Sequence, residues 1–294
     1  MKQTILGAIY LSLTASIWGG MYVVSKYILD FIPPLTLVWL RFIIAFVVLY
    51  FILKIAEKKQ KKKATIRKKD WLLFAWIGFI GYFISITCQF IGTKLSDAHT
   101  GSLVTSATPA FMVIFAALIL KEKLTARRLL STIIATIGVI IVIGWDIEIG
   151  SYFIGTIILV GAAITWALLS IYVKIASIQF SSLVITTYAI FFSLFFITPF
   201  MIGELQTSSI GTVNTYVILG VLYLGIVSTA GAFFLWNKGL DLMDASIGSL
   251  FFFFQPIVGS LLGWLLLNET LNSNFFIGGM LIICSVFITT FEKK

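Results

Sequence analysis

Residues 96–110 read SDAHTGSLVTSATPA, and residues 243–257 read MDASIGSLFFFFQPI. In register, the two stretches share Asp97/Asp244, Ala98/Ala245, Gly101/Gly248, Ser102/Ser249, Leu103/Leu250 and Pro109/Pro256. The copies lie 147 residues apart, which is half of the 294-residue chain. The same segment, with a proline inside an apolar run, therefore occurs once in each half. This pattern predicts an internal duplication.

The composition is typical of a membrane protein. The chain is 60% hydrophobic and 11% charged, with a mean hydropathy of +1.06, whereas a soluble domain carries about 25% charged residues. Apolar runs of about 20 residues span a bilayer as helices. Ten such runs are present, at about 5–29, 35–55, 71–94, 98–120, 127–145, 152–174, 182–202, 214–236, 245–267 and 275–291. We predict an all-α polytopic membrane protein with ten transmembrane helices in a lipid bilayer.

The basic residues predict the orientation, because Lys and Arg gather in cytoplasmic loops. With the N-terminus inside, 18 of the 21 Lys and Arg lie in cytoplasmic segments, nine of them within residues 54–69. Lys26 and Lys94 then lie outside, and Arg41 lies within the second run. We therefore expect both termini in the cytoplasm and the chain in the cell (inner) membrane. Because the positive charge is so unevenly spread, it does not indicate a nucleic-acid partner.

The duplication has a geometric consequence. Five helices in the first half place the start of the second half on the opposite face of the membrane, so the halves are inverted. Inverted repeats are a recurrent plan for secondary transporters, with the substrate site near the midplane between them. We predict one five-helix repeat at 1–147 and a second, inverted one at 148–294. Further matches at an offset of 147 or 148 residues are Gly7/Gly155, Trp18/Trp166, Lys26/Lys174, Gly78/Gly225, Glu122/Glu269 and Leu124/Leu271.

Several motifs occur in both halves. Each half has a Trp in its first helix and a D-A-x-x-G-S-L segment that enters its fourth, and these helices end in K-E-K-L-T at 121–125 and N-E-T-L-N at 268–272. With an LRF at 40–42, the whole chain resembles the EamA-type family of the drug/metabolite transporter superfamily. The resemblance implies a bacterial inner-membrane exporter of amino acids or other small metabolites. Lys121 and Asn268 stand where that family has a glycine before the Glu.

The prolines of the repeated segment are candidate helix kinks or gates. Pro109 and Pro256 lie roughly in the middle of their runs, where a proline removes a backbone hydrogen bond. One interpretation is a kink that exposes polar backbone to a cavity, beside Thr105, Thr108 and Gln255, and the other is a packing kink. Gln255 itself is interpreted either as a substrate ligand or as a hydrogen-bond partner of another helix, because intramembrane polar groups face the bundle interior.

Aromatic residues deep in the helices are further candidates for substrate binding. Trp18 and Trp166 lie away from the interfaces where Trp usually gathers, so they form either a cavity wall or bulky core packing. Tyr22 lies four residues after Trp18, on the same helix face. Tyr82 and Gln89 lie two turns apart on one face of the third helix and are weaker candidates.

Charged residues near the helices have two interpretations each. Arg41 lies six residues into its run, about 9 Å deep at 1.5 Å per residue, and it either pairs with a substrate carboxylate or snorkels to the headgroups. Asp97 and Asp244 suit helix N-caps. Glu122 and Glu269 suit structural turns, with proton coupling as the alternative.

Other classes of protein fit less well. The chain has no GxxxxGK[ST], HExxH or GxSxG sequence, so it is predicted to be neither an ATPase nor an enzyme. Cys88 and Cys284 lie in apolar runs and His99 is the one histidine, so no cofactor or metal is expected. The partner is a small-molecule substrate. A membrane scaffold, a channel, drug efflux and metabolite uptake remain as alternatives, while proton coupling and the oligomeric state stay open.

Overall fold

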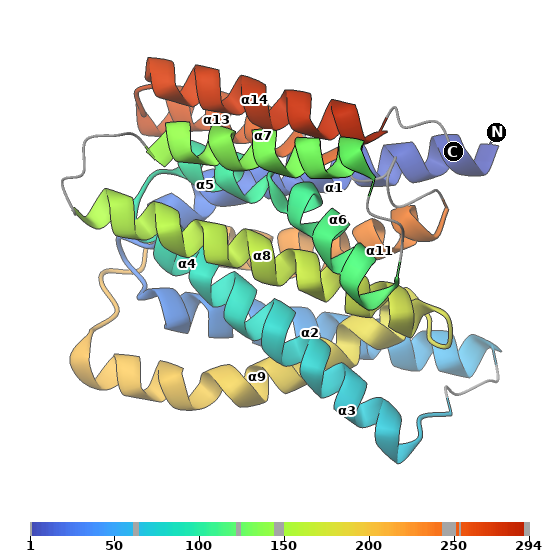
Figure 1. The fold of residues 1–294 in the computed structure, drawn as a ribbon. Helices are drawn as coiled ribbons and strands as arrows, with labels where there is room; N and C mark the ends of the chain where they lie inside the picture. Colours follow the sequence, from blue (N-terminus) through green and yellow to red (C-terminus); the bar gives the residue numbers. More distant parts are fainter. Residues whose placement is uncertain are drawn as a thin grey trace.

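The structure, a computed structural model, describes residues 2–60, 65–121, 125–143, 150–242, 251–252 and 254–290. Over these ranges the chain is helical and has no strand (Figure 1). The helices are α1 (Lys2–Ile28), α2 (Pro34–Gln60), α3 (Lys68–Ile77), η1 (Gly78–Ser85), α4 (Ile86–Leu95), α5 (Ala98–Thr105), α6 (Thr108–Ile119), α7 (Ala126–Ile143), α8 (Ser151–Ser177), α9 (Ser182–Thr207), α10 (Thr215–Leu222), η2 (Tyr223–Gly231), α11 (Ala232–Asp241), α13 (Phe254–Leu267) and α14 (Ser273–Thr290).

The predicted apolar runs are helical over most of their described length. In the described residues, seven helical stretches are long and apolar enough to cross a membrane. One of them, Lys68–Leu95, joins α3, η1 and α4. Phe254–Leu267 and Ser273–Ser285 are shorter apolar helices. The all-α class is confirmed for the described residues, whereas the total of ten spans stays a prediction, because parts of the chain such as 243–250 lie outside them.

The outer surface of the bundle is apolar and its interior is partly polar. The side chains of Leu72, Leu118 and Phe195 are 75%, 71% and 71% exposed, while Thr186 and Ser228 are fully buried. Large exposed apolar surfaces of this kind are rare on soluble monomers. Lipid tails cover them without cost in a membrane helix bundle.

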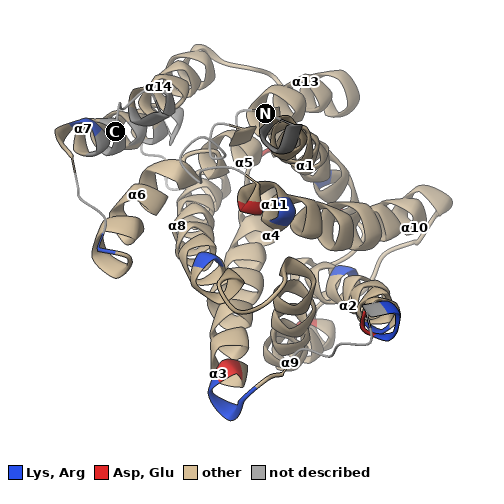
Figure 2. Ribbon diagram, turned by 90° about the vertical axis from the view of Figure 1, so that its right-hand side faces the viewer, with Lys and Arg blue, Asp and Glu red and all other residues tan. Residues whose placement is uncertain are grey.

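Positive charge is concentrated at one end of the bundle. Figure 2 shows most of the drawn Lys and Arg at the end that faces the viewer, where α1 begins and α2, α8 and α11 end. Lys26 and Lys94 lie in the last turns of α1 and α4, at the opposite end. The segregation follows the predicted pattern, and the assignment of the Lys-rich end to the cytoplasm remains a prediction.

The prediction of a mid-helix proline was wrong for Pro109. The run 98–120 is divided by a turn at Ser106 and Ala107, and Pro109 lies in the first turn of α6. Proline is tolerated there because a first-turn N–H has no intrahelical partner to lose. Pro256 lies in α13, but residue 253, directly before the first described residue of that helix, lies outside the described residues. A proline that does lie inside a helix is Pro199 of α9.

The third stretch of each half contains a π-helical segment at an equivalent place. Gly78 opens η1 and its repeat mate Gly225 lies in η2. Such segments leave some backbone groups without regular helical partners and are frequent at functional sites.

Helix packing follows the same pattern from either half. α1 packs against α11 and α13, and α8 packs against α4 and α6. Likewise α2 packs against η2, α9 packs against η1, and α7 pairs with α14. Because α8, α9 and α14 follow α1, α2 and α7 at the repeat offset, each contact has a counterpart when the halves are exchanged.

The residues that replace the family's glycines adopt backbone conformations that favour glycine. Lys121 has φ 57° and Asn268 has φ 53°, within the left-handed region that costs an L-residue about 1–2 kcal/mol. Asn tolerates this region far better than Lys does. The turn geometry is therefore kept without the glycine.

Candidate functional site

A small cavity lies between the two halves of the chain. Its lining is drawn from both halves and comprises Trp18, Met21, Ser85, Ile86, Gln89, Thr105, Thr108, Ala162, Trp166, Phe233, Phe252 and Gln255. Six of the nine predicted substrate-binding residues are among them: Trp18, Gln89, Thr105, Thr108, Trp166 and Gln255. Its free volume of about 20 Å³ has room for about one water molecule, so a metabolite fits only after the lining side chains move apart.

The lining repeats itself at the spacing of the duplication. Four pairs of lining residues lie 147 or 148 positions apart: Trp18/Trp166, Ile86/Phe233, Thr105/Phe252 and Thr108/Gln255. Thus the same positions of both halves face the cavity. The residue types differ in three of the four pairs, so the cavity is symmetric in position and asymmetric in chemistry.

An aromatic cluster forms one part of the wall. The rings of Trp18 and Trp166 meet edge to face, with centroids 5.5 Å apart. Trp18 also contacts Phe233 and Phe252, each at 5.9 Å. Edge-to-face pairs contribute about 0.5–1.5 kcal/mol beyond the area they bury. The two interpretations of the tryptophans therefore coexist, because the same rings pack against each other and line the cavity.

A chain of polar side chains closes another part of the cavity. Gln255 donates from Nε2 to Thr105 Oγ1 at 2.6 Å and to the Ser102 carbonyl at 3.0 Å. Thr105 Oγ1 and Tyr22 Oη share a hydrogen bond of 2.7 Å, and Gln89 Nε2 donates to Tyr22 Oη. The network joins α1, α4, α5 and α13, so Gln255 bonds another helix and also faces the cavity.

Two buried polar atoms of the lining have no hydrogen-bond partner among the described residues. They are Oε1 of Gln89, an acceptor, and Nε1 of Trp166, a donor. By contrast, Nε1 of Trp18 donates to the Ser228 carbonyl at 3.1 Å. A buried polar group without a partner costs about 1–3 kcal/mol, so a ligand that bonds both atoms would gain affinity.

Three predicted residues lie near the cavity without lining it. Tyr22 stands behind the lining in the polar network. Tyr82 stacks on Phe233 at 4.9 Å and lines a small neighbouring hollow that also touches Trp166. Arg41 is fully buried, so the snorkelling interpretation was wrong: its guanidinium turns into the bundle and finds hydrogen-bond acceptors there.

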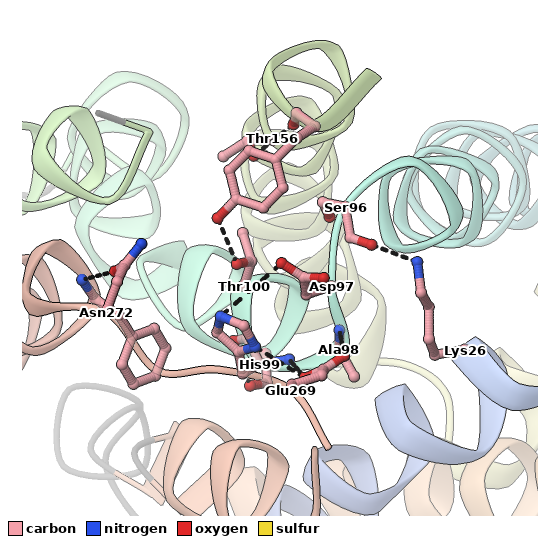
Figure 3. Close-up of polar contacts among 12 residues, drawn as sticks. Lys26, Ser96, Asp97, Ala98, His99, Thr100, Thr156, Glu269 and Asn272 are labelled. Atoms are coloured by element: carbon pink, nitrogen blue, oxygen red, sulfur yellow. Dashed lines mark hydrogen bonds and ion pairs between the residues drawn. The ribbon is translucent and has the colours of Figure 1, made fainter. Parts of the chain in front are cut away.

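The end of the bundle opposite the Lys-rich end is closed by a contact between the halves (Figure 3). Glu269, in the link between α13 and α14, accepts hydrogen bonds from the backbone N–H groups of Ala98 and His99 at 2.7 and 3.0 Å. Its Oε2 also lies 2.8 Å from His99 Nδ1. A carboxylate at a helix N-terminus meets orphan donors and the positive end of the dipole.

The prediction that Asp97 caps this helix by its side chain was wrong. Asp97 occupies the N-cap position of α5, but its carboxylate makes no capping bond. It lies 4.0 Å from His99 Nε2 instead. The long Glu269 side chain reaches across from the other half and takes both amides. Asp244 and Glu122, the repeat mates of Asp97 and Glu269, lie outside the described residues.

The two carboxyls respond to this environment in opposite ways. Burial raises the pKa of Asp97, and the nearby Glu269 adds to that rise against the attraction of His99 and Lys26. Burial also acts to raise the pKa of Glu269, but the bonds from His99 and from the backbone amides outweigh it and leave the pKa lowered. Glu269 is therefore held as a carboxylate.

Six lining residues were missed by the sequence analysis: Met21, Ser85, Ile86, Ala162, Phe233 and Phe252. For two of them a signal was available. Phe252 follows the candidate Thr105 at the repeat offset. Ser85 precedes Gln89 by one helical turn on the same face. The others are apolar residues with no mark that distinguishes them from core positions.

Comparison with known proteins gives a consistent result. The model of the EamA-like transporter family matches residues 5–144 and again 153–291. The chain is 28% identical over 291 residues to "Uncharacterized transporter YetK" of Bacillus subtilis (strain 168), which covers 97% of this chain and 87% of the relative. It is 26% identical over 292 residues to a "Probable amino-acid metabolite efflux pump" of Escherichia coli (strain K12), covering 96% and 94%. A solved crystal structure, 21% identical over 96% of both chains, shares the fold with a TM-score of 0.66.

Proposed function

We propose a specific transport activity for this chain, which belongs to the EamA-like transporter family. Members of the family are transporters and not enzymes, and the chain is a multi-pass membrane protein. Our proposal is that it exports amino acids or related small metabolites across the bacterial inner membrane. It does so as a secondary transporter, by alternating access between two inverted halves.

The observation that carries the proposal is the cavity lined by equivalent positions of both halves. Alternating access requires a site near the midplane that lies between the repeats. Pairs such as Thr108/Gln255 put equivalent residues of the two halves on one cavity. The two matches to the family model, one in each half, support the repeats at 1–147 and 148–294.

The chemistry of the cavity supports a small amphipathic substrate. The Trp18 and Trp166 rings offer an apolar wall, and Gln89 Oε1 and Trp166 Nε1 offer an acceptor and a donor. A relative named as an amino-acid metabolite efflux pump supports the same class.

The contact at one end of the bundle supports a transport cycle. Glu269 joins the halves at the end that we assign to the outside, and the hollow lined by Tyr82 continues from the cavity toward the Lys-rich end. In our proposal, the Glu269 contact breaks when the site opens outward. The hollow then closes as the halves rock. With the Lys-rich end in the cytoplasm, both termini are cytoplasmic.

The test is counterflow in proteoliposomes. Vesicles are preloaded with unlabelled amino acids, and entry of labelled aromatic and branched-chain ones is followed. A carrier accelerates exchange, whereas a channel gives no counterflow and a scaffold moves nothing. Exchange of drugs alone would replace amino acids by drug efflux. No exchange with any solute, in protein shown to be folded, would refute the transport proposal.

A pair of variants ties the activity to the site. Gln255→Ala removes a lining amide and is expected to lower exchange about tenfold, the effect of one lost hydrogen bond of about 1.4 kcal/mol. Leu266→Ala, on the same helix with its side chain 65% exposed, is the matched control and should leave exchange unchanged.

A further inference from the structure

A buried positive charge lies beside the cavity. Arg41, in α2, is 0% exposed. Its Nε donates to Thr229 Oγ1 at 2.8 Å, and one terminal nitrogen donates to Ser228 Oγ at 3.3 Å. The other terminal nitrogen lies 3.5 Å from the Met21 sulfur, and the guanidinium carbon lies 4.9 Å above the Phe90 ring.

All of these partners are neutral. Among the described residues, no Asp or Glu pairs with Arg41. Charged groups inside a membrane bundle are expensive, pair with one another as a rule, and mark substrate or ion pathways. An arginine held by two hydroxyls, a thioether and a ring still lacks the anion that its charge would select.

Met21 connects this charge with the cavity. Met21 lines the cavity and also contacts the guanidinium through its sulfur. A thioether is a weak hydrogen-bond acceptor, and methionine is the most adaptable of the apolar side chains. A stronger acceptor arriving from the cavity would therefore displace it readily.

The charge belongs to one half only. The positions 147 and 148 residues after Arg41 are Tyr188 and Ala189. The asymmetry is what a polar substrate with one charged end requires, because a symmetric pair of arginines would call for two anionic groups. Trp166 Nε1 and Gln89 Oε1 remain for the neutral or cationic remainder of the molecule.

We propose that Arg41 receives the carboxylate of the substrate, with Met21 as the side chain that moves aside. This rests on the proposed transport function and adds its substrate class: solutes with a carboxylate, zwitterionic or anionic. A planar guanidinium binds a carboxylate through two parallel hydrogen bonds. Lipophilic cations and neutral alcohols of the same shape are then poor substrates.

The experiment compares matched solutes that differ only at this group. Counterflow and ligand-induced shifts in melting temperature are measured for phenylalanine and leucine, and for phenylalaninol and leucinol, in which CH₂OH replaces the carboxylate. The wild-type protein should prefer one or both acids over their alcohols by about tenfold to a hundredfold, the range expected for hydrogen bonds to a charged group.

Variants assign the preference to the residue. Arg41→Met should reduce the preference for acids over alcohols to about twofold, because the methionine side chain donates no hydrogen bond to a carboxylate. The variant should fold, because an apolar side chain of similar length can replace a buried charge with little strain. Arg41→Lys should give an intermediate preference, since it keeps the charge and loses the two-bond geometry. Lys94→Met, at an exposed position in α4, removes the same charge elsewhere and should keep the wild-type preference.

The outcomes separate this inference from the transport function. Equal exchange of acids and alcohols by the wild type would overturn the role of Arg41 and leave the carrier intact. A carboxylate preference that persists in Arg41→Met would overturn it too. If that variant does not fold, a wild-type preference in Arg41→Lys with both solute pairs overturns it. No exchange of any solute refutes transport itself, and the inference with it.

Discussion

Glu269 binds His99 twice, through the backbone N–H at 3.0 Å and through ring Nδ1 at 2.8 Å. One carboxylate of the second half thus caps the first turn of α5 in the first half. The bond is interrupted whenever the two halves separate at this end. Helix capping, usually a local feature of one segment, here joins the two repeats.

Replacing this carboxylate should loosen the contact. We expect Glu269→Gln to increase hydrogen exchange of the Ala98 and His99 amides by a factor of about 5–30, which corresponds to a cap of about 1–2 kcal/mol. Exchange mass spectrometry of the 96–105 peptide measures it. Asp97→Asn is the matched control, because Asp97 makes no capping bond, and unchanged protection in Glu269→Gln would contradict a closing role.

The contact should also depend on pH. In the closed contact the pKa of Glu269 is lowered below its usual 4.5, so the ionised carboxylate favours closure. Closure is at full strength above pH 4.5 and weakens as the pH falls toward the lowered value. Protection factors for the Ala98 and His99 amides should therefore decline over the window from pH 4.5 down to the lowered pKa of Glu269.

The groups around Glu269 define the control for this titration. Three ionisable groups lie near Glu269 or near the residues around it: Asp97, His99 and Lys26. Glu269→Gln should remove the decline in protection over that window, while Asp97→Asn should retain it. A decline that survives in Glu269→Gln would assign the titration to another of these groups.

Thr105 is expected to matter more than Thr108. The Thr105 hydroxyl contacts Gln255 and Tyr22 in two other helices. The Thr108 hydroxyl donates at 2.6 Å to the carbonyl of Thr105 in its own stretch and reaches another helix only at 3.5 Å, at the Ala163 carbonyl. Thr105→Val should lower the free energy of unfolding by about 1–3 kcal/mol and slow exchange. Thr108→Val should do less than half of that, as measured by thermal unfolding in detergent, and a larger effect of Thr108→Val would contradict the network.

The left-handed turns predict a stabilising substitution. Lys121→Gly should raise the free energy of unfolding by up to about 1 kcal/mol, because φ 57° strains a lysine and not a glycine. Asn268→Gly should change little, since Asn tolerates φ 53°. The same replacement at Lys58, within α2, should instead destabilise the protein. Thermal unfolding of the three variants measures these changes, and an unchanged or lowered stability of Lys121→Gly would contradict backbone strain at Lys121.

Composition and spacing predicted most of the fold. Long apolar runs become helices in any membrane protein, because backbone polar groups must pair within their own segment. The repeat at 147 residues correctly pointed to positions such as Thr105 and Gln255, since the duplicated segment enters the cavity in both halves. The bounds of α5 and α6 were missed because a proline at residue 109 is compatible with either a kink or a new helix.

The side-chain contacts across the halves were beyond the sequence. Asp97 matches the N-cap pattern, and nothing in the chain indicates that Glu269, more than 170 residues away, reaches the same amides. Arg41 shows the same limit, because the pattern of α2 gives its depth and not the direction of its side chain. That direction depends on η2, where Ser228 and Thr229 supply the acceptors.

The edge-to-face contact of Trp18 with Trp166 is an intrinsic spectroscopic probe of the arrangement of the two halves. One indole comes from each half, and both border the cavity. The proposed rocking of the halves would change their distance and angle, and therefore the near-ultraviolet circular dichroism of the pair. Trp166→Phe removes the contribution of this pair and leaves that of Trp18 with Trp236, whose ring centroids are 5.2 Å apart.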